Sequence, residues 1–255
     1  MSTVDVSSRV DAYLERIGAP RPRQLDLEAL AALQYAHLVA VPFENIDVFD
    51  RVPVSVAQQD VLTKIVDYGR GGWCFENNGS FAWLLEALGF SVRRLGAAVL
   101  IDGPNTLVDH LTIEVQLDRA YLVDVGFGDS FIRPLDLTTG APQDGGSGAF
   151  QFIPSPQGTT LAEIEDGLPV AKFRFKRVVH PLAEFAAASQ RLFDDADAHW
   201  QRWPFATRLL GSGADRVTLL ADRLKLRRDG ETIETPVGPD EWDAALLEWF
   251  SMRRG

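Results

Sequence analysis

The spacing of hydrophobic residues changes near residue 90, and this change limits the possible folds more than any other feature of the chain. Before it, apolar residues recur every three or four positions in VDAYLERI, LDLEALAALQYAHLVAV and VAQQDVLTKIVDYG, which is the period of amphipathic helices. Pro42 ends the second helix, Gly69 ends the third, and a further apolar helix, FAWLLEAL, ends at Gly89. Residues 1–90 are therefore predicted to form a helical domain.

From residue 91 to about residue 180 the pattern consists of short β-rich runs separated by turn residues: VRRLGAAVLI, HLTIEVQL, AYLVDVGF, GAFQFI and KFRFKRVV. Such runs predict a small antiparallel β-barrel or a strongly bent sheet. Residues 181–255 mix a helix, LAEFAAASQRLF, with two strands, RVTLLAD and RLKLRRD, and a terminal helix, EWDAALLEWF. The predicted fold class is α+β with three domains, over residues 1–90, 91–180 and 181–255.

Composition excludes several classes of function. The chain has one cysteine, so a disulfide within it is impossible and a cysteine-based metal site is not expected. A net charge of −11 repels a phosphate backbone, which argues against nucleic-acid binding as the main function. We find neither a signal-peptide pattern at the amino terminus nor an apolar run long enough for a membrane span, and we expect a cytoplasmic protein without a metal. The sequence indicates no oligomeric state.

The single cysteine, Cys74, follows Arg70-Gly71-Gly72-Trp73 and precedes a helix. Its thiol is therefore expected at the amino end of that helix, where unpaired amides and the helix dipole favour the thiolate. Gly71 and Gly72 lack a Cβ atom, so we expect a sharp entry into the helix and room for a substrate beside the sulfur. By position alone, Cys74 is either a nucleophile or a small buried hydrophobic residue.

A nucleophilic thiol needs a base, and the four histidines are the candidates. His37 lies within an apolar helical pattern, where packing accounts for it. His180 and His199 lie beside a proline or on a polar helical stretch, with nothing nearby in the sequence to orient them. His110 opens the strand LTIEVQL, and the following strand, YLVDVG, contains Asp124 near its end. We therefore select His110 as the base and Asp124 as the acid that orients it.

Two registers of this hairpin are compatible with the sequence. A turn at residues 116–118 places His110 directly opposite Asp124. A turn at residues 118–120 separates the two by four positions unless a β-bulge restores the register. Asp109 is a rival orienting group, although adjacent strand residues point to opposite faces. If neither register holds, the pair is a strand-edge histidine and a turn aspartate without a catalytic role.

Three motifs together resemble the arylamine N-acetyltransferase family. RGGWCFENN resembles the family signature RGGxCxExN, with Arg70, Cys74, Glu76 and Asn78 in their places. VPFENIDV resembles an upstream family motif, and LVDVGFG resembles the segment that supplies the acid. The motifs occur in the family's order over residues 4–137. The last third resembles the family weakly, through stretches such as WPFATRL, and it is short for the group.

The resemblance implies a helical domain, a β-barrel and an α/β lid, with a core like that of transglutaminases and cysteine proteases. It implies that Cys74, His110 and Asp124 meet where the first two domains join, and that Glu44 and Arg70 form a structural ion pair there. Asp109 stands where the family has threonine, which puts the choice of acceptor in doubt.

The implied activity is ping-pong transfer of an acetyl group from acetyl-CoA, the cosubstrate, through Cys74 to an arylamine or a hydrazine. The Cys74 amide and a neighbouring strand amide are candidate oxyanion donors. Three alternatives stay open: an amide synthase of the same family acting on another acyl thioester in natural-product biosynthesis, a Cys-His-Asp hydrolase, and a binding protein that keeps the fold without catalysis.

Coenzyme A carries phosphates, for which two segments are candidates. Gly126, Phe127 and Gly128 are expected to offer an open backbone beside the pantetheine or pyrophosphate, unless either glycine serves only as a turn. The basic strand KFRFKRVV is the other candidate, unless it simply forms a solvated strand face; its cationic side chains are Lys172, Arg174, Lys176 and Arg177.

Overall fold

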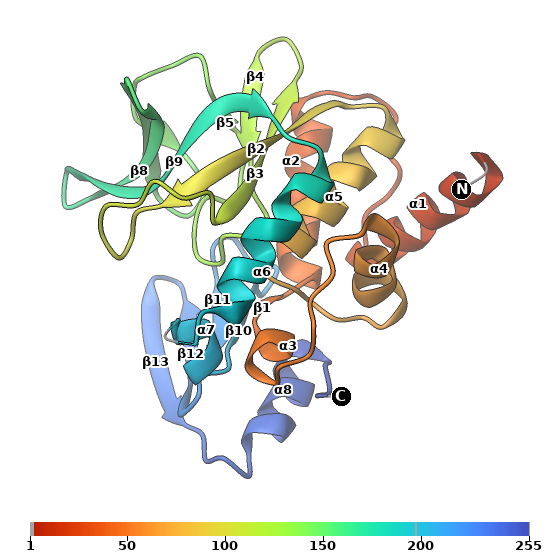
Figure 1. Ribbon diagram of the computed structural model, residues 1–255, viewed down its shortest axis with the longest axis vertical. Helices are drawn as coiled ribbons and strands as arrows, with labels where there is room; N and C mark the ends of the chain where they lie inside the picture. Colours follow the sequence, from red (N-terminus) through yellow and green to blue (C-terminus); the bar gives the residue numbers. More distant parts are fainter. Residues whose placement is uncertain (1–2, 197, 255) are drawn as a thin grey trace.

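The computed structural model describes residues 3–196 and 198–254, and it has the α+β architecture that the sequence predicts. Helices from the first third of the chain lie beside an eight-stranded antiparallel sheet, and a five-stranded sheet lies at the opposite end of the molecule (Figure 1). The division into three domains at residues 90 and 180 stays a prediction.

The helices of the first third begin and end where the sequence provides signals. The Asp26 side chain accepts a hydrogen bond from Ala29 N and caps α2, which ends just before Pro42. Gly89 has φ 104° and ends α5 in the left-handed conformation, as predicted. These helices are α1 (Thr3–Ile17), α2 (Leu27–Ala40), α3 (Ile46–Phe49), α4 (Gln58–Leu62), the π-helix η1 (Thr63–Asp67) and α5 (Cys74–Leu88).

The large sheet has the strand order β5-β4-β3-β2-β9-β8-β7-β6. Its two edge strands are joined by one side chain, because Gln143 accepts a hydrogen bond from Asp136 N at 2.7 Å and donates one to Asp136 O at 3.1 Å. The sheet is thus a nearly closed barrel. Its strands are β2 (Ser91–Val99), β3 (His110–Gln116), β4 (Ala120–Val123), β5 (Leu135–Asp136), β6 (Gln143–Asp144), β7 (Ala149–Ser155), β8 (Gly158–Glu165) and β9 (Leu168–Val179).

Strand β3 contributes to two cores because its side chains alternate between the faces of the sheet. Leu111, Ile113 and Val115 pack into the core formed by the helices. His110, on the other face, contacts the ring of Phe173, which belongs to the phenylalanine-rich core inside the barrel. The alternation therefore places His110 at the junction between the helices and the barrel.

The second sheet has the order β1-β10-β11-β12-β13 and encloses a separate small core with α8 (Trp242–Phe250). Its first strand comes from the helical region, since Phe43 pairs with Thr207 across most of the chain length. The strands are β1 (Phe43–Glu44), β10 (Ala206–Leu209), β11 (Arg216–Leu219), β12 (Arg223–Arg228) and β13 (Glu231–Pro236).

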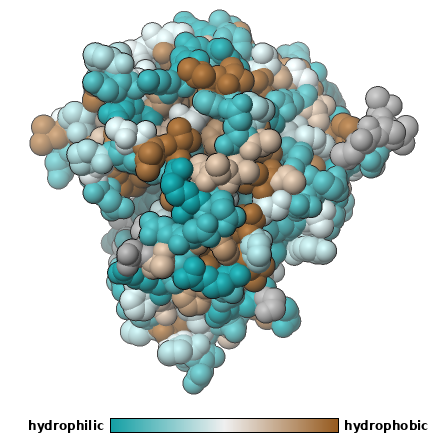
Figure 2. Space-filling view, viewed as in Figure 1, coloured by the Kyte–Doolittle hydropathy of each residue, from teal (hydrophilic) through white to brown (hydrophobic). Residues whose placement is uncertain are grey.

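A helical connection leads from the barrel to the second sheet and crosses the middle of the molecule in Figure 1. It consists of the 3₁₀ helix η2 (Leu182–Phe185), α6 (Ala186–Asp194) and α7 (His199–Arg202). On the face shown in Figure 2, hydrophobic residues form separate small patches among hydrophilic ones. Within the described ranges, no helix combines the length and the hydrophobicity that crossing a membrane requires.

Several strands were not predicted from the sequence. β13 is exposed along its whole length and therefore has no apolar alternation to reveal it. The turn at Asp229-Gly230, with φ 50° and 82°, joins β12 to this strand. β8 and β10 were missed as well, and β1 has only two residues.

Candidate active site

Cys74 is the first residue of α5, as the sequence predicts. Glu76 fixes this helix start, because its Oε2 accepts a hydrogen bond from Trp73 N at 3.1 Å. The other carboxylate oxygen of Glu76 accepts a hydrogen bond from Lys64 Nζ at 2.8 Å, and Lys64 also pairs with Asp47 at 2.7 Å. Burial raises the pKa of Glu76, although Lys64 partly offsets this. An ion-pair network thus lies beneath the amino end of the helix.

The space next to Gly71 and Gly72 is filled by neighbouring groups of the protein. A Cβ atom on Gly71 would lie 2.2 Å from the carbonyl oxygen of Pro42, and one on Gly72 would lie 2.6 Å from Glu76 Oε2. Neither glycine has a positive φ. The two glycines are therefore needed because the Pro42 carbonyl group and the side chains of Glu44 and Glu76 pack directly against them.

The structure brings His110 and Asp124 into contact, with 2.6 Å between His110 Nε2 and Asp124 Oδ2. Both side chains are buried. The Oδ1 atom of Asp124 accepts hydrogen bonds from Asn78 Nδ2 at 2.8 Å and Gly126 N at 2.9 Å, so the carboxylate is held from three sides.

Both predicted registers of the hairpin were wrong. Gln116 pairs with Ala120, so the turn is centred on Asp118, and the ladder between β3 and β4 ends at Ile113 and Val123. Asp124 therefore lies just beyond β4. It reaches His110 diagonally because both side chains point to the same face of the sheet.

His110 also interacts with Cys74. Burial lowers the pKa of His110, but the Asp124 carboxylate and the cysteine raise it by a larger amount, to about 10. Since Nε2 bonds to Asp124, Nδ1 is the ring nitrogen that remains for the sulfur. The Cys74 Sγ atom lies 3.7 Å from the backbone carbonyl oxygen of Asp109, to which the thiol donates. The three predicted side chains thus form one continuous cluster.

Asp109, the rival candidate for orienting His110, bonds to other groups. The Asp109 carboxylate accepts hydrogen bonds from Val99 N at 2.8 Å and from Asn105 Nδ2 at 2.5 Å. No bond from this carboxylate to His110 is found among the described residues.

The remaining histidines differ from His110. His37 is fully buried and bonds to Tyr13 Oη through Nδ1 at 3.0 Å, which fits the expected packing role. His180 was expected to have no orienting neighbour, but its Nδ1 lies 2.9 Å from Glu184 Oε2 at the surface. The side chain of His199 lies outside the described part of the structure.

Cys74 and His110 line a cavity of about 580 Å³ at the junction of the barrel, the helices and the second sheet. Its aromatic lining is suited to a flat ring, and its carboxylates come from Asp102, Asp109 and Asp195. The aromatic residues are Phe43, Trp73, Phe127, Trp200 and Phe205.

One asparagine holds the wall formed by the connection to the second sheet. Asn45 Nδ2 donates to Trp200 O at 2.6 Å and to Trp203 O at 2.9 Å, and Asn45 Oδ1 accepts from Phe205 N at 2.8 Å. Its side chain amide thereby fixes a segment that follows it by about 160 residues.

The glycine segment after Asp124 has mixed roles. Gly126 approaches the nucleophile closely, since a Cβ atom here would lie 2.8 Å from Cys74 Cα. Phe127 packs on His110 with 5.1 Å between ring centroids and lines the cavity. Gly128 has φ 85° and lines an adjacent pocket.

The ion pair implied between Glu44 and Arg70 is present, with 2.9 Å between Oε1 and Nη2. Arg70 also pairs with Asp47 at 2.9 Å. Glu44 is almost fully buried and its Oε2 accepts a hydrogen bond from Ile46 N.

Comparison with known proteins assigns the chain to a family. Residues 26–253 match a family model described as N-acetyltransferase. The chain belongs to this family. The resemblance to arylamine N-acetyltransferases is confirmed by an enzyme of that name from Mycolicibacterium smegmatis, which is 40% identical over 141 residues. The pineal gland isozyme from Gallus gallus is 38% identical over 133 residues.

These alignments cover about half of each N-acetyltransferase and about half of this chain: 51% of both chains for the mycobacterial protein, and 46% of the chicken protein with 50% of this chain. The chain therefore spans about half the length of the curated relatives it matches. The structure of the Mycobacterium marinum arylamine N-acetyltransferase in complex with CoA superposes with a TM-score of 0.87 and 27% identity. That superposition covers 95% of this chain and 92% of the other.

This N-acetyltransferase family member also has a basic pocket of about 300 Å³ that shares Phe43, Phe127 and Phe205 with the cavity. Its charged lining consists of Arg216, Lys225 and Arg227 with the single carboxylate of Asp129. Arg216 is 4% exposed, and within the described residues its Nη2 has no hydrogen-bond partner. The pocket therefore fits an anionic group.

Of the segments named from the sequence for the coenzyme A phosphates, Phe127 and Gly128 line this pocket, whereas the basic strand KFRFKRVV does not contribute to it. In that strand, Lys172 pairs with Glu163 at 2.6 Å, Arg174 donates to Asn105 O at 2.8 Å, and Arg177 pairs with Glu114 at 2.6 Å. The basic strand RLKLRRD was the available signal for the pocket, because it contains Lys225 and Arg227.

Proposed function

We propose that this protein transfers an acetyl group from acetyl-CoA to an arylamine or a hydrazine by a ping-pong mechanism, with Cys74, His110 and Asp124 as its catalytic residues. The observation that carries the proposal is the continuous cluster of these three side chains at the wall of an aromatic cavity. Membership of the N-acetyltransferase family supports the reaction class.

In the first half-reaction, His110 Nδ1 accepts the thiol proton and Cys74 Sγ attacks the carbonyl carbon of the thioester. The bond between that carbon and the sulfur of coenzyme A breaks, and His110 returns its proton to the departing thiolate. Asp124 holds the imidazole in the correct tautomer and stabilises its charged form. The backbone amide of Cys74 is our candidate for stabilising the oxyanion.

In the second half-reaction, the amine nitrogen attacks the acetyl carbon bound to Cys74. His110 takes a proton from the amine and returns it to the sulfur as the thioester bond breaks, which regenerates the thiol. The aromatic walls of the cavity bind the ring of the acceptor.

The phosphates of coenzyme A fit the basic pocket, where Arg216, Lys225 and Arg227 outnumber Asp129. Gly126 and Phe127 then border the pantetheine on its way to Cys74, and Gly128 lies beside the phosphates. A complex of the Mycobacterium marinum relative with CoA supports the choice of cosubstrate.

The test is to mix the purified protein with acetyl-CoA and to measure CoA release with and without an arylamine or a hydrazine. We expect release that depends on the amine and an acetyl adduct on Cys74 by mass spectrometry, with Cys74→Ala as the control. Release without dependence on the amine would indicate a hydrolase. No adduct would exclude covalent catalysis on this substrate, and an adduct only with longer acyl thioesters would favour an amide synthase.

A further inference from the structure

The side-chain amide of Asn78 joins three segments of the site. Asn78 lies on α5 four residues after Cys74, so the two side chains share one face of the helix, and it is fully buried. Its Nδ2 atom donates hydrogen bonds to Leu111 O at 2.6 Å and to Asp124 Oδ1 at 2.8 Å. Its Oδ1 atom accepts a hydrogen bond from Val125 N at 2.8 Å.

This amide occupies the place of a backbone pair that is missing from the β3–β4 hairpin. The ladder ends at the pair of Ile113 and Val123. Hydrogen-bonded pairs of an antiparallel ladder recur every second residue, so the next pair in this register would join Leu111 to Val125. The backbone groups of these two residues bond to Asn78 instead. The side chain therefore separates the two strands just beyond the end of the ladder.

The separation occurs where the catalytic side chains leave the hairpin. Leu111 follows His110 in the chain, and Val125 follows Asp124. The third hydrogen bond of the amide holds Asp124 Oδ1, while Oδ2 of the same carboxylate lies 2.6 Å from His110 Nε2. Because Cys74 begins the helix that carries the amide, the same contacts fix the sulfur-bearing helix against the hairpin.

Only one orientation of the Asn78 amide satisfies all three partners. Nδ2 faces two acceptors and Oδ1 faces an N–H donor, so a reversed amide would oppose like groups at every contact. An aspartate offers no donor when it is ionised, and the single oxygen of a serine cannot replace both ends of the amide. The space is closed as well, since a Cβ atom on Gly126 would lie 2.8 Å from Nδ2.

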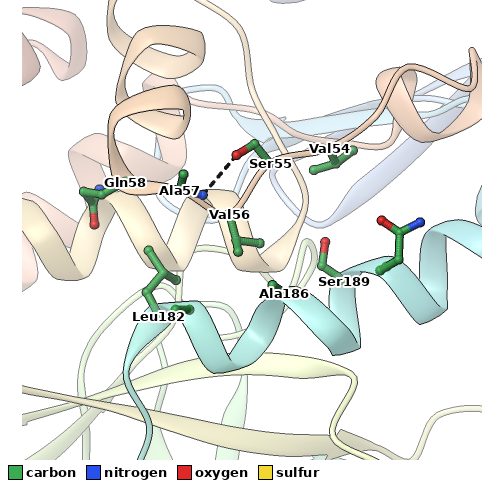
Figure 3. A pocket seen from close by; sticks show the side chains of 10 residues that line it. Val54, Ser55, Val56, Ala57, Gln58, Leu182, Ala186 and Ser189 are labelled. Atoms are coloured by element: carbon green, nitrogen blue, oxygen red, sulfur yellow. Dashed lines mark hydrogen bonds between the residues drawn. The ribbon is translucent and has the colours of Figure 1, made fainter.

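Another neighbour of α5, the η2–α6 connection, is packed less tightly. Leu182 of η2 lies 3.1 Å from the position that a Cβ atom on Gly79 would take. The same leucine borders a cavity of about 620 Å³ between residues 54–58 and the connection (Figure 3). A contact beside such a cavity constrains α5 less than the buried hydrogen bonds of Asn78 do.

We infer that Asn78 is a positioning residue that sets the mutual placement of Cys74, His110 and Asp124. The donor end of its amide fixes the carboxylate that bonds to His110, and the acceptor end keeps the hairpin open beside it. The inference rests on the proposed function only in taking these three side chains as the catalytic ones.

The pH dependence of Cys74 alkylation by iodoacetamide tests this role without acetyl transfer. In Asn78→Ser the Asp124 carboxylate loses a donor and can turn away from His110, so the imidazolium that accompanies the thiolate is stabilised less. The pH of half-maximal alkylation should therefore rise by about one unit, which slows the reaction about tenfold at the acidic end of the profile.

Asn77→Ser is the matched control. Asn77 is also fully buried on α5, but its Nδ2 atom donates to Pro42 O at 3.1 Å. Its replacement removes a buried amide outside the hairpin, so the pH profile should keep its midpoint. An equal shift in Asn77→Ser would show that any buried loss on this helix has the same effect, and the inference would fail.

Asn78→Asp separates the role of the amide from that of its shape. The change is nearly isosteric, yet it should slow alkylation at about pH 7 more than Asn78→Ser does, because a carboxylate then faces Asp124 Oδ1 and a carbonyl oxygen. A role in packing alone would give the opposite order, with Asn78→Asp the milder variant.

NMR of the unmodified protein covers the case in which a variant does not fold. The side-chain NH₂ signal of Asn78 should shift with pH around the midpoint of Cys74 alkylation, because this group donates to Asp124. The NH₂ signal of Asn77 should not follow that midpoint. The inference is overturned if the Asn78 signal does not respond, or if Asn78→Ser leaves the alkylation profile unchanged.

A last measurement connects this role to the proposed reaction. Asn78→Ser should slow Cys74 acetylation at saturating acetyl-CoA about tenfold, because the three groups are misplaced. The Kd of coenzyme A should stay unchanged, since the basic pocket is formed by other residues. If the unmodified protein is not acetylated, the proposed function fails, and the alkylation and NMR measurements still decide the role of Asn78.

Discussion

Replacing Asp124 by asparagine should reverse the tautomer of His110. Asn78 Nδ2 and Gly126 N both donate to Asp124 Oδ1, so an asparagine here is held with its oxygen at that position. Its NH₂ group then takes the place of Oδ2, 2.6 Å from His110 Nε2 in the unmodified protein. Because an N–H donor requires Nε2 to be the acceptor, the ring proton moves to Nδ1, which can then no longer take the thiol proton.

The expected loss is large although the change is nearly isosteric. In a Ser-His-Asp enzyme, the equivalent substitution lowers kcat by about 10⁴-fold through the same change of tautomer. This factor corresponds to about 5.5 kcal/mol in the barrier. The hydrogen bonds at Oδ1 are preserved, so we expect the folded structure to survive.

The assay is the rate of Cys74 acetylation by p-nitrophenyl acetate, followed by nitrophenol release and by intact-protein mass. Asp109→Asn is the matched control, because its carboxylate bonds to Val99 N and Asn105 rather than to His110, and it should stay near the unmodified rate. If Asp124→Asn retained more than about a tenth of the rate, the tautomer argument would be refuted.

Other predictions follow from the same contacts. Gly126→Ala forces a Cβ atom to 2.8 Å from Cys74 Cα, and calorimetry should record a loss of about 1–3 kcal/mol together with slower acetylation; unchanged values would contradict the close approach. Lys64→Met leaves the buried Glu76 carboxylate without its cation, and urea unfolding should show a loss of about 3 kcal/mol, whereas a loss near zero would mean that the network adds no stability. His37 stays neutral in the folded protein because burial lowers its pKa to about 3, while the unfolded chain binds a proton below about pH 6.5. The free energy of unfolding should therefore fall as the pH drops below about 6.5. His37 contributes about 1.4 kcal/mol per pH unit to this fall until its folded-state pKa is approached, and His37→Phe should flatten that slope in urea titrations. The carboxylates that line the cavity should favour cationic arylamines over anionic ones in kcat/KM, and added salt should reduce the preference; a preference for 4-aminobenzoate over a cationic analogue would contradict this.

The position of Cys74 was predictable because its signals are local. A short motif followed by a strongly apolar helical pattern places the residue at a helix start, and the structure agrees. The crowding of the glycines before it was not predicted, because the groups that pack against Gly71 and Gly72 include Pro42, about 30 residues earlier in the chain.

His110 and Asp124 were selected from the sequence as the partners of the thiol, but the register of the hairpin that carries them was not predicted. A turn centred on Asp118 differs from each expected turn by one residue, and sequence patterns do not resolve such a shift. The basic strand RLKLRRD was visible in the sequence, but its meeting with Phe127 and Gly128 in one pocket was not, because the pairing of the second sheet depends on contacts between distant segments. Arg216 lines it from β11, far along the chain from Gly128.

The wall of the cavity that Asn45 holds can form only late in the synthesis of the chain. The wall around Trp200 and Phe205 is anchored to a side chain near residue 45, so the thiol emerges from the ribosome well before that wall exists. At bacterial or eukaryotic translation rates the interval is about ten seconds. Contacts of such long sequence separation form late in folding. The nascent chain therefore presents Cys74 without its finished enclosure, and the reactive centre is completed only when the last quarter of the polypeptide docks.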